Sequence, residues 1–411
     1  MRCKATPPQL RRSRNITCAY HKHHSVVNDH CCSAFRINCK EYHMKLAAKK
    51  LGFGCMRLPQ KDGKIDEAAV CEMFDYFLAN GFTYFDTAHG YHNGLSETTL
   101  KTCLTSRYPR EAYTITNKLT TPYFKDEAAI RPFFEKQLEW CGVEYFDYYL
   151  MHAQDSGNYP HFTKHRAYET ALALKKEGKI KHFGISFHDT ADMLKIILDD
   201  HPEIEVVQLQ FNYVDYDDSA VQARKCYELC RAYGKPVIVM EPVKGGSLVN
   251  LPAKAQSYFD ALEGGGSNAS YAIRFAAGFE GVEMVLSGMS DIAQVKDNVS
   301  YMKDFVPLNK KEQEAVKNVC AVFKSLNMIP CTACRYCVDG CPKNIYIPDV
   351  FSCLNQKTAF GSWNQDYYYE IYTTNKGKAS DCIECGKCEK SCPQHLPIRD
   401  LLKKVAAEFE H

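Results

Sequence analysis

DEAAVCEMFDYFLANGFTYFDTA, at residues 66–88, carries the signals of one helix and one strand in succession. Over residues 66–81 apolar side chains recur three or four positions apart and a glycine ends the run, which predicts an amphipathic helix. The next run, at 83–88, is short and rich in aromatic side chains, which is typical of a strand. The stretch therefore predicts a helix followed directly by a strand.

The same alternation extends along most of the chain. Strand-like runs recur at intervals of about thirty residues, at 51–56, 83–88, 113–119, 145–153, 182–188, 205–211, 236–241 and 282–288. Helix-like stretches lie between several of them, at 66–81, 125–142, 168–179, 190–200 and 219–234. Eight strand–helix units predict an α/β fold of the (β/α)8 or TIM-barrel type, with its active site where the strands end. A doubly wound open sheet is the alternative, but the first unit has no G-x-G-x-x-G sequence.

Two cysteine motifs follow the predicted barrel, CTACRYCVDGCP at 331–342 and CIECGKCEKSCP at 382–393. Each reads C-x2-C-x2-C-x3-C-P, the spacing that gives three thiolates to one iron–sulfur cluster and a fourth to its neighbour. The motifs predict two [4Fe–4S] clusters. With this cross-ligation, one cluster takes Cys331, Cys334, Cys337 and Cys392, and the other takes Cys382, Cys385, Cys388 and Cys341. Four-cysteine zinc sites are the alternative, although a zinc ribbon needs only two cysteines per knuckle.

The chain divides into three predicted regions. The barrel is expected over 44–326, ending in a helix at 309–326, and a mainly helical two-cluster ferredoxin-like domain over 327–411. Residues 1–43 hold five cysteines, five histidines, eight basic and two acidic residues without a helical or strand period. We expect that segment to be unstructured, or an artefactual extension that precedes a start at Met44.

Composition and charge argue against two classes of partner, membranes and nucleic acids. No apolar run approaches the length of a membrane span, so we expect a cytoplasmic protein without a membrane partner. Without the first 43 residues the chain has 43 basic and 47 acidic residues, which argues against nucleic acid as a partner.

Four polar residues fall at or just beyond predicted strand ends. FDTAHGY contains Asp86 and Tyr91, TNKL contains Lys118, and LMHA contains His152. A barrel gathers such residues at one mouth. A phenol is a poor acid at neutral pH, but an adjacent ammonium lowers its pKa, so Lys118 would assist Tyr91 as a proton donor. Asp86 would hold Lys118 charged, and His152 would hydrogen-bond a substrate carbonyl.

These motifs, together with LGFGCMRLP at 51–59 and GMSDIAQVKDN at 288–298, resemble those of the aldo-keto reductases. The whole chain resembles the bacterial subgroup of that family with a C-terminal 4Fe–4S ferredoxin-like domain. The resemblance implies a catalytic tetrad of Asp86, Tyr91, Lys118 and His152, with Tyr91 as general acid. It also implies reduction or oxidation of a small carbonyl or alcohol substrate with NADPH or NADH.

The resemblance further assigns the nicotinamide contacts and the adenosine contacts. It places Ser186 and Gln208 at the nicotinamide, and it places Gly288, Ser290, Gln294 and Asn298 at the adenosine end. Three positions depart from the family pattern, and they bear on cofactor affinity and on the choice of NADP or NAD. Phe187 replaces a common asparagine, Met240 replaces a stacking tyrosine, and Gln294 replaces an arginine.

Nicotinamide moves a hydride, whereas each iron–sulfur cluster moves one electron. Three explanations are open: the clusters pass electrons to a flavin or a redox partner protein, they drive a radical or two-step one-electron reduction of the substrate, or they are structural. The alternative function is an electron-carrier or redox-sensing protein whose barrel binds nicotinamide without carbonyl turnover. The long connection at 243–268, with glycines at both ends, is expected to be either a mobile flap over the cofactor or an ordinary surface excursion.

Overall fold

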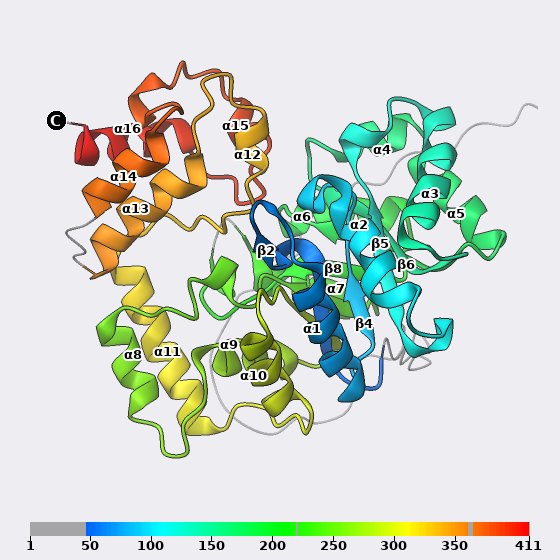
Figure 1. The fold of residues 1–411 in the computed structure, drawn as a ribbon, viewed down its shortest axis with the longest axis horizontal. Helices are drawn as coiled ribbons and strands as arrows, with labels where there is room; N and C mark the ends of the chain where they lie inside the picture. The colour runs from blue at the N-terminus through cyan, green and yellow to red at the C-terminus, as the bar shows by residue number, and fades with distance from the viewer. Residues whose placement is uncertain (1–46, 219–220, 361–364, 411) are drawn as a thin grey trace, which may run out of the picture. The chain divides into compact units, whose positions relative to one another are not determined.

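The computed structural model describes residues 47–218, 221–360 and 365–410, so the expected extension at 1–43 lies outside the described residues. Eight parallel strands close into a barrel, in which each strand pairs with the next one along the chain and β1 pairs with β10 (Figure 1). They are β1 (Leu51–Gly54), β4 (Tyr84–Asp86), β5 (Thr114–Leu119), β6 (Phe146–Gln154), β7 (Ile180–Phe187), β8 (Val206–Gln210), β9 (Val237–Met240) and β10 (Val282–Ser287). The predicted barrel is confirmed, and the open-sheet alternative is wrong.

Helices surround the strands. They are α1 (Glu67–Ala79), α2 (Leu95–Leu100), α3 (Glu127–Cys141), α4 (Tyr159–Lys164), α5 (Ala167–Lys176), α6 (Ala191–Asp200), α7 (Ala223–Ala232), α8 (Ala253–Asp260), α9 (Asn268–Ala277), α10 (Ile292–Met302) and α11 (Lys310–Ser325). Helix α1 illustrates how local sequence specifies a helix. At its start the Asp66 carboxylate accepts a hydrogen bond from the Ala69 amide, and on one face Val70, Phe74 and Phe77 are buried. A short antiparallel pair, β2 (Gln60–Lys61) and β3 (Lys64–Ile65), precedes α1.

Side chains fill the interior of the barrel, so chemistry is confined to its mouth. The buried interior cluster consists of Tyr84, Tyr148, Leu150, Val206, Ile238, Met284 and Leu286. Gly184 on β7 is required by this packing, because a Cβ there would lie 2.4 Å from the carbonyl oxygen of Val206 on β8.

The long connection at 243–268 contains a packed helix. Helix α8 lies against α11 (Figure 1). The Phe259 ring stacks on that of Tyr271 with centroids 4.2 Å apart. Val249 and Ser267, from the two ends of the connection, line the cavity at the barrel mouth. The mobile-flap interpretation stays a prediction, and it concerns these ends rather than α8.

The C-terminal region is helical, as predicted. It comprises α12 (Tyr336–Asp339), α13 (Ile347–Phe360), α14 (Gln365–Thr373), α15 (Lys387–Lys390) and α16 (Ile398–Phe409). Its own apolar core includes Ile347, Phe351, Leu402 and Val405, and Cys337 and Cys388 of the two cysteine motifs are buried in it. Within the described ranges no helix has the length and apolar character needed to cross a membrane.

Candidate active site

The four residues predicted at the strand ends meet at the barrel mouth. Lys118 on β5 is fully buried, and its Nζ donates to Asp86 Oδ1 at 2.6 Å and to Tyr91 Oη at 3.3 Å. The rings of Tyr91 and His152 lie edge to face with centroids 6.2 Å apart. The hydroxyl oxygen of Thr120 is 2.7 Å from Nδ1 of His152. Carboxylate, ammonium and phenol thus form one hydrogen-bonded chain beside an imidazole.

Burial is the largest influence on the pKa values of these side chains. It raises the pKa of Tyr91 well above the ordinary value of 10.0, and the charge of Asp86 raises it further. The net pKa of Tyr91 is therefore raised by burial, and the expectation that the ammonium of Lys118 assists Tyr91 as a proton donor stays a prediction. Burial also lowers the pKa of Lys118 from 10.5, and it lowers the pKa of His152 well below 6.5. At neutral pH the site holds a protonated phenol and a neutral imidazole.

A buried carboxylate, Glu97, supports the site from behind. Its Oε1 accepts from Asn117 Nδ2 at 2.8 Å and from Gln137 Nε2 at 3.0 Å, and its Oε2 lies 2.6 Å from Nδ1 of His89. Asn117 in turn accepts from the backbone amide of Lys118 at 2.8 Å. Glu97 thus fixes the strand that presents Lys118. The sequence analysis missed this role, although Glu97 lies within the sequence FDTAHGYHNGLSE at 85–97.

A cavity of about 640 Å³ lies at the barrel mouth. Most of the predicted catalytic and cofactor-binding residues line it, namely Asp86, Tyr91, His152, Gln208, Gly288, Ser290, Gln294 and Asn298. Lys118 and Ser186 do not line the cavity. Lys118 lies behind the wall and reaches the site through its contact with Tyr91. The volume is sufficient for a ligand of drug-like size.

The residues predicted to contact the nicotinamide form hydrogen bonds with other residues of the protein. Gln208 on β8 donates from Nε2 to Asp86 Oδ2 at 3.0 Å. Ser186 on β7 accepts at Oγ from the backbone amide of Ala153, a residue with φ of +50°. Met240 lines the cavity, whereas Phe187 is 2% exposed and lies in the core. The nicotinamide contacts of Ser186 and Gln208 stay a prediction.

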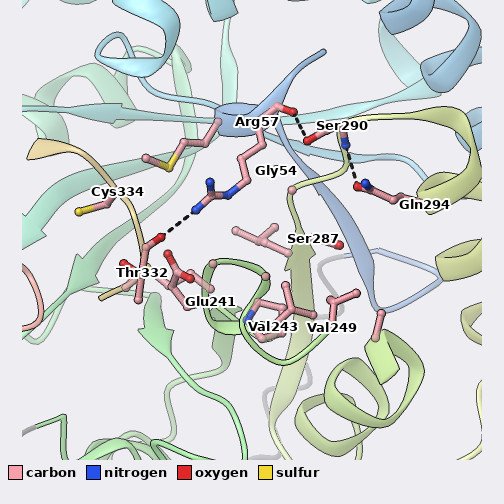
Figure 2. Close-up of a pocket in the computed structure, with 18 of the residues that line it drawn as sticks. Gly54, Arg57, Glu241, Val243, Val249, Ser287, Ser290, Gln294, Thr332 and Cys334 are labelled. Carbon is pink, nitrogen blue, oxygen red and sulfur yellow. Dashed lines mark hydrogen bonds between the residues drawn. The ribbon is translucent and has the colours of Figure 1, made fainter. Parts of the chain in front are cut away.

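The residues predicted at the adenosine end meet around the start of α10. Gln294 Oε1 accepts from the Ser290 amide at 2.9 Å, and Ser290 Oγ donates to the backbone carbonyl of Arg57 at 2.9 Å (Figure 2). Asn298 Nδ2 donates to Ser287 Oγ at 2.7 Å. These bonds bring the turn after β1, the end of β10 and α10 together along one side of the cavity. A role for Gly288, Ser290, Gln294 and Asn298 in binding NADPH or NADH stays a prediction.

Three further polar side chains, which the sequence analysis missed, line the cavity: Arg57, His188 and Glu241. Burial raises the pKa of Glu241, which Arg57 opposes (Figure 2). Burial lowers the pKa of His188 to about 4, and its Nδ1 has no hydrogen-bond partner among the described residues. Arg57 lies in the sequence LGFGCMRLP, and His188 and Glu241 end strand-like runs, but their meeting at the cavity follows from packing between elements that are distant in sequence.

Four of the cysteines enclose a second, smaller cavity. Its lining includes Cys331, Cys334, Cys337 and Cys392, the set predicted from cross-ligation to hold one cluster. The apolar side chains of Ile347, Phe351, Leu396 and Ile398 complete its wall. Within the described ranges no three His, Cys, Asp or Glu side chains lie at the distances of a single-ion site. Four thiols are the number of ligands that a [4Fe–4S] cluster takes, and the assignment of these four to one cluster stays a prediction.

The two cysteine motifs share one backbone conformation. Ala333 and Glu384, which follow the first cysteine of each motif by two positions, both have φ near +50° (+52° and +55°). Arg335 and Gly386, which precede α12 and α15, have φ of +69° and +72°. The backbone amide of Ala333 donates to Cys331 Sγ at 3.4 Å. The sequence repeat is therefore also a structural repeat, as expected of two similar cluster-binding loops.

Polar contacts join the cysteine loops to the barrel. Arg57, beyond β1, donates to the carbonyl oxygen of Thr332 at 3.0 Å (Figure 2). Gln210 on β8 and Gln394 exchange two amide hydrogen bonds, at 2.8 and 2.6 Å, and both side chains are buried. His395 Nε2 lies 2.7 Å from the carbonyl oxygen of His188. Residues beside Cys331, Cys334 and Cys392 thus form part of the barrel mouth.

Comparison with known proteins gives matches to both regions. The model of the aldo/keto reductase family matches residues 50–321, and that of the 4Fe-4S dicluster domain matches residues 330–397. L-galactose dehydrogenase of Arabidopsis thaliana is 25% identical over 301 residues, which are 68% of this chain and 92% of that protein. One component of the ion-translocating oxidoreductase complex of Buchnera aphidicola is 27% identical over 92 residues, which are 21% of this chain and 17% of that protein.

Solved structures match the barrel. An aldo-keto reductase from Bacillus halodurans, in its holo form, has a TM-score of 0.55 at 24% identity, covering 67% of this chain and 95% of that one. An aldo-keto reductase from Klebsiella pneumoniae in complex with NADPH has a TM-score of 0.55 at 18% identity, covering 66% and 90%. These likenesses support the barrel fold.

Proposed function

The chain belongs to the aldo/keto reductase family, and from that premise we propose that it interconverts a small carbonyl compound and its alcohol with NAD(P)H, coupled to electron transfer through two [4Fe–4S] clusters. The observation that carries the proposal is the buried chain from Asp86 through Lys118 to Tyr91, which ends in the cavity beside His152. A phenol with this support is suited to proton transfer.

Each of the four residues has a distinct part in the reaction. NAD(P)H, when bound, supplies a hydride to the carbonyl carbon. Tyr91 donates its proton to the carbonyl oxygen, and the Lys118 ammonium stabilises the tyrosinate that forms, since Nζ already donates to Tyr91 Oη. Asp86 holds Lys118 in place. In the His152 tautomer whose ring proton lies on Nε2, Nδ1 accepts from the Thr120 hydroxyl and the Nε2 proton can be donated to the substrate oxygen.

The test is Tyr91→Phe in the full-length holoprotein. Removing the proton donor should lower kcat by about 10²- to 10⁴-fold, as is usual for a general acid. The generic probe 4-nitrobenzaldehyde and a panel of aldehydes and ketones serve as substrates. Iron content and NADPH binding should be unchanged. Tyr76→Phe, on the outer helix α1, is the matched control and should retain full turnover. Turnover of Tyr91→Phe at the wild-type rate would exclude the acid role.

A second candidate is an electron carrier or redox sensor without carbonyl turnover. It is favoured by the second cysteine loop, where Cys385 is exposed and Ile383 is 57% exposed, as at a surface that meets a redox partner protein. This candidate expects a stable complex with a one-electron carrier and no substrate among the carbonyl panel. Turnover that depends on Tyr91 would exclude it.

A further inference from the structure

The barrel cavity and the cysteine-lined cavity share a wall. Thr332, Cys334 and Gln394 line both. Tyr336, which begins α12 between Cys334 and Cys337, also lines the barrel cavity, and so does Pro393 directly after Cys392. The Cys334 side chain therefore lies between the barrel cavity and the cysteine-lined cavity. A ligand at the barrel mouth would lie against the loop that contains Cys334.

This wall is fixed by buried contacts. The Thr332 carbonyl accepts from Arg57, and it lies so close to Gly245 that a Cβ there would be 2.4 Å from the oxygen. The Gln210–Gln394 amide pair holds the other side of the wall. A loop held at both sides by the barrel is a well-defined boundary of the cavity, because paired buried amides specify one arrangement.

The other cysteine set lies elsewhere. None of Cys341, Cys382, Cys385 and Cys388, all within the described ranges, lines the barrel cavity. Cys385 is exposed, and its neighbour Ile383 is the most exposed large apolar side chain of the C-terminal region that the structure describes. The two predicted cluster sites are therefore not equivalent: one borders the cavity and the other faces solvent.

We propose that the Cys331, Cys334, Cys337 and Cys392 set holds the cluster that is in contact with the ligand of the barrel, with Cys334 and Tyr336 as the surface of contact. The inference rests on the proposed function, since it requires both the clusters and a ligand in the cavity. It assigns the active-site role to one cysteine set and the surface role to the other. It also makes Tyr336, a residue of the cluster-binding loop, part of the ligand site.

The experiment is electron paramagnetic resonance of the anaerobic full-length holoprotein reduced with dithionite, before and after addition of saturating NADPH. One cluster signal should shift its g values and the other should stay unchanged. Cys334→Ser should alter the responding signal, and Cys385→Ser the silent one. Tyr336→Phe, which leaves every cysteine in place, should lose the NADPH-induced shift. Tyr372→Phe, on α14, is the matched control and should keep it.

The outcomes separate the two proposals. If neither cluster signal changes when NADPH is bound, as verified by NADPH fluorescence, the proposed contact is overturned. The proposed reductase function would be unaffected by that result. If Cys385→Ser alters the signal that responds to NADPH, the assignment of the two cysteine sets is overturned. Absence of iron and sulfide, or absence of binding of both NADPH and NADH, would overturn the proposed function and this inference together. A shift that persists in Tyr336→Phe would remove Tyr336 from the contact.

Discussion

Lys118 is the residue on which the proposed catalytic arrangement depends. Its ammonium is fully buried and has donor contacts to Asp86 and Tyr91 and to the carbonyl oxygen of Thr87, at 2.9 Å. Burial lowers its pKa, and the charge of Asp86 opposes that effect. A buried ion pair of this kind contributes little net stability, but removal of one partner leaves the other charge uncompensated.

Lys118→Met should therefore destabilise the fold and abolish turnover. Loss of one partner of a buried ion pair costs about 3–5 kcal/mol. The thermal unfolding midpoint, followed by circular dichroism, measures this cost. The double variant Asp86→Asn with Lys118→Met should recover much of the stability without recovering activity. A double variant no more stable than Lys118→Met alone would contradict the uncompensated-charge explanation.

The pH dependence of the reaction follows from the same burial. Reduction needs His152 neutral, Lys118 charged and Tyr91 protonated. His152 has a pKa well below 6.5, so acid should remove activity only well below that pH. Tyr91 has a pKa well above 10.0, whereas the pKa of Lys118 lies below 10.5, so loss of the lysine proton should set the alkaline limit. A profile of kcat/KM against pH should be flat from 6.5 to the alkaline limb. A limb centred near the ordinary histidine pKa would contradict the burial of His152.

At the scale of elements, the connection after β9 meets the first cysteine loop at Gly245. This residue has φ of +64°, and a Cβ would lie 2.4 Å from the Thr332 carbonyl oxygen. Gly246, its neighbour, also has a positive φ of +99°, but nothing lies within 4 Å of the corresponding Cβ position. A substitution at Gly246 therefore tests backbone strain alone, whereas a substitution at Gly245 tests backbone strain and steric contact together.

Gly245→Ala should displace the Thr332 loop, whereas Gly246→Ala should show only the cost of its backbone conformation. Overpacking of this kind typically costs about 1–3 kcal/mol. The rate at which the iron–sulfur absorbance is lost during anaerobic heating reports the displacement. It should be faster in Gly245→Ala than in Gly246→Ala. Equal rates would show that the loop tolerates the added methyl group.

At the scale of the whole molecule, the barrel and the cysteine loops share the buried Gln210–Gln394 pair. Gln210 also donates to Asp215 at 2.8 Å, and Asp215 is paired with Lys244, so the amides belong to a larger buried polar network. Such networks are costly when one partner is removed.

Gln394→Leu should destabilise the holoprotein by about 1–3 kcal/mol, because the amide of Gln210 loses a buried partner. Gln210→Leu should cost a similar amount, and the double variant should cost less than the sum. Thermal unfolding followed by both circular dichroism and cluster absorbance gives the double-mutant cycle. Additive costs would show that the pair does not couple the barrel to the cysteine loops.

Removal of iron should also affect the barrel site. Chelation under reducing conditions frees the cysteine loops, which contribute Thr332, Tyr336 and Gln394 to the cavity wall. We expect weaker NADPH binding, measured by fluorescence, with the barrel's circular dichroism largely retained. Reconstitution with iron and sulfide is the control and should restore affinity. An affinity that is independent of iron would show that the wall does not need the clusters.

Local sequence patterns were enough to predict the barrel and the candidate catalytic residues. Helix and strand periods are local, so runs such as 66–88 predict their elements without knowledge of the fold. Parallel strands of a barrel point the same way, so Asp86, Lys118 and His152 had to meet once their strands were recognised. The cysteine spacing likewise predicts the set that surrounds the second cavity.

Packing in three dimensions determines which residues from outside the barrel motifs border the cavity, and which protonation states the site holds. His188, Tyr336 and Gln394 reach the mouth through packing between segments far apart in the chain, which no local pattern encodes. The pKa of Tyr91 is raised overall, because burial depends on everything packed around the phenol, whereas the sequence displayed only its charged neighbours. Sequence spacing specifies which groups are available; three-dimensional packing sets their solvent exposure and their partners.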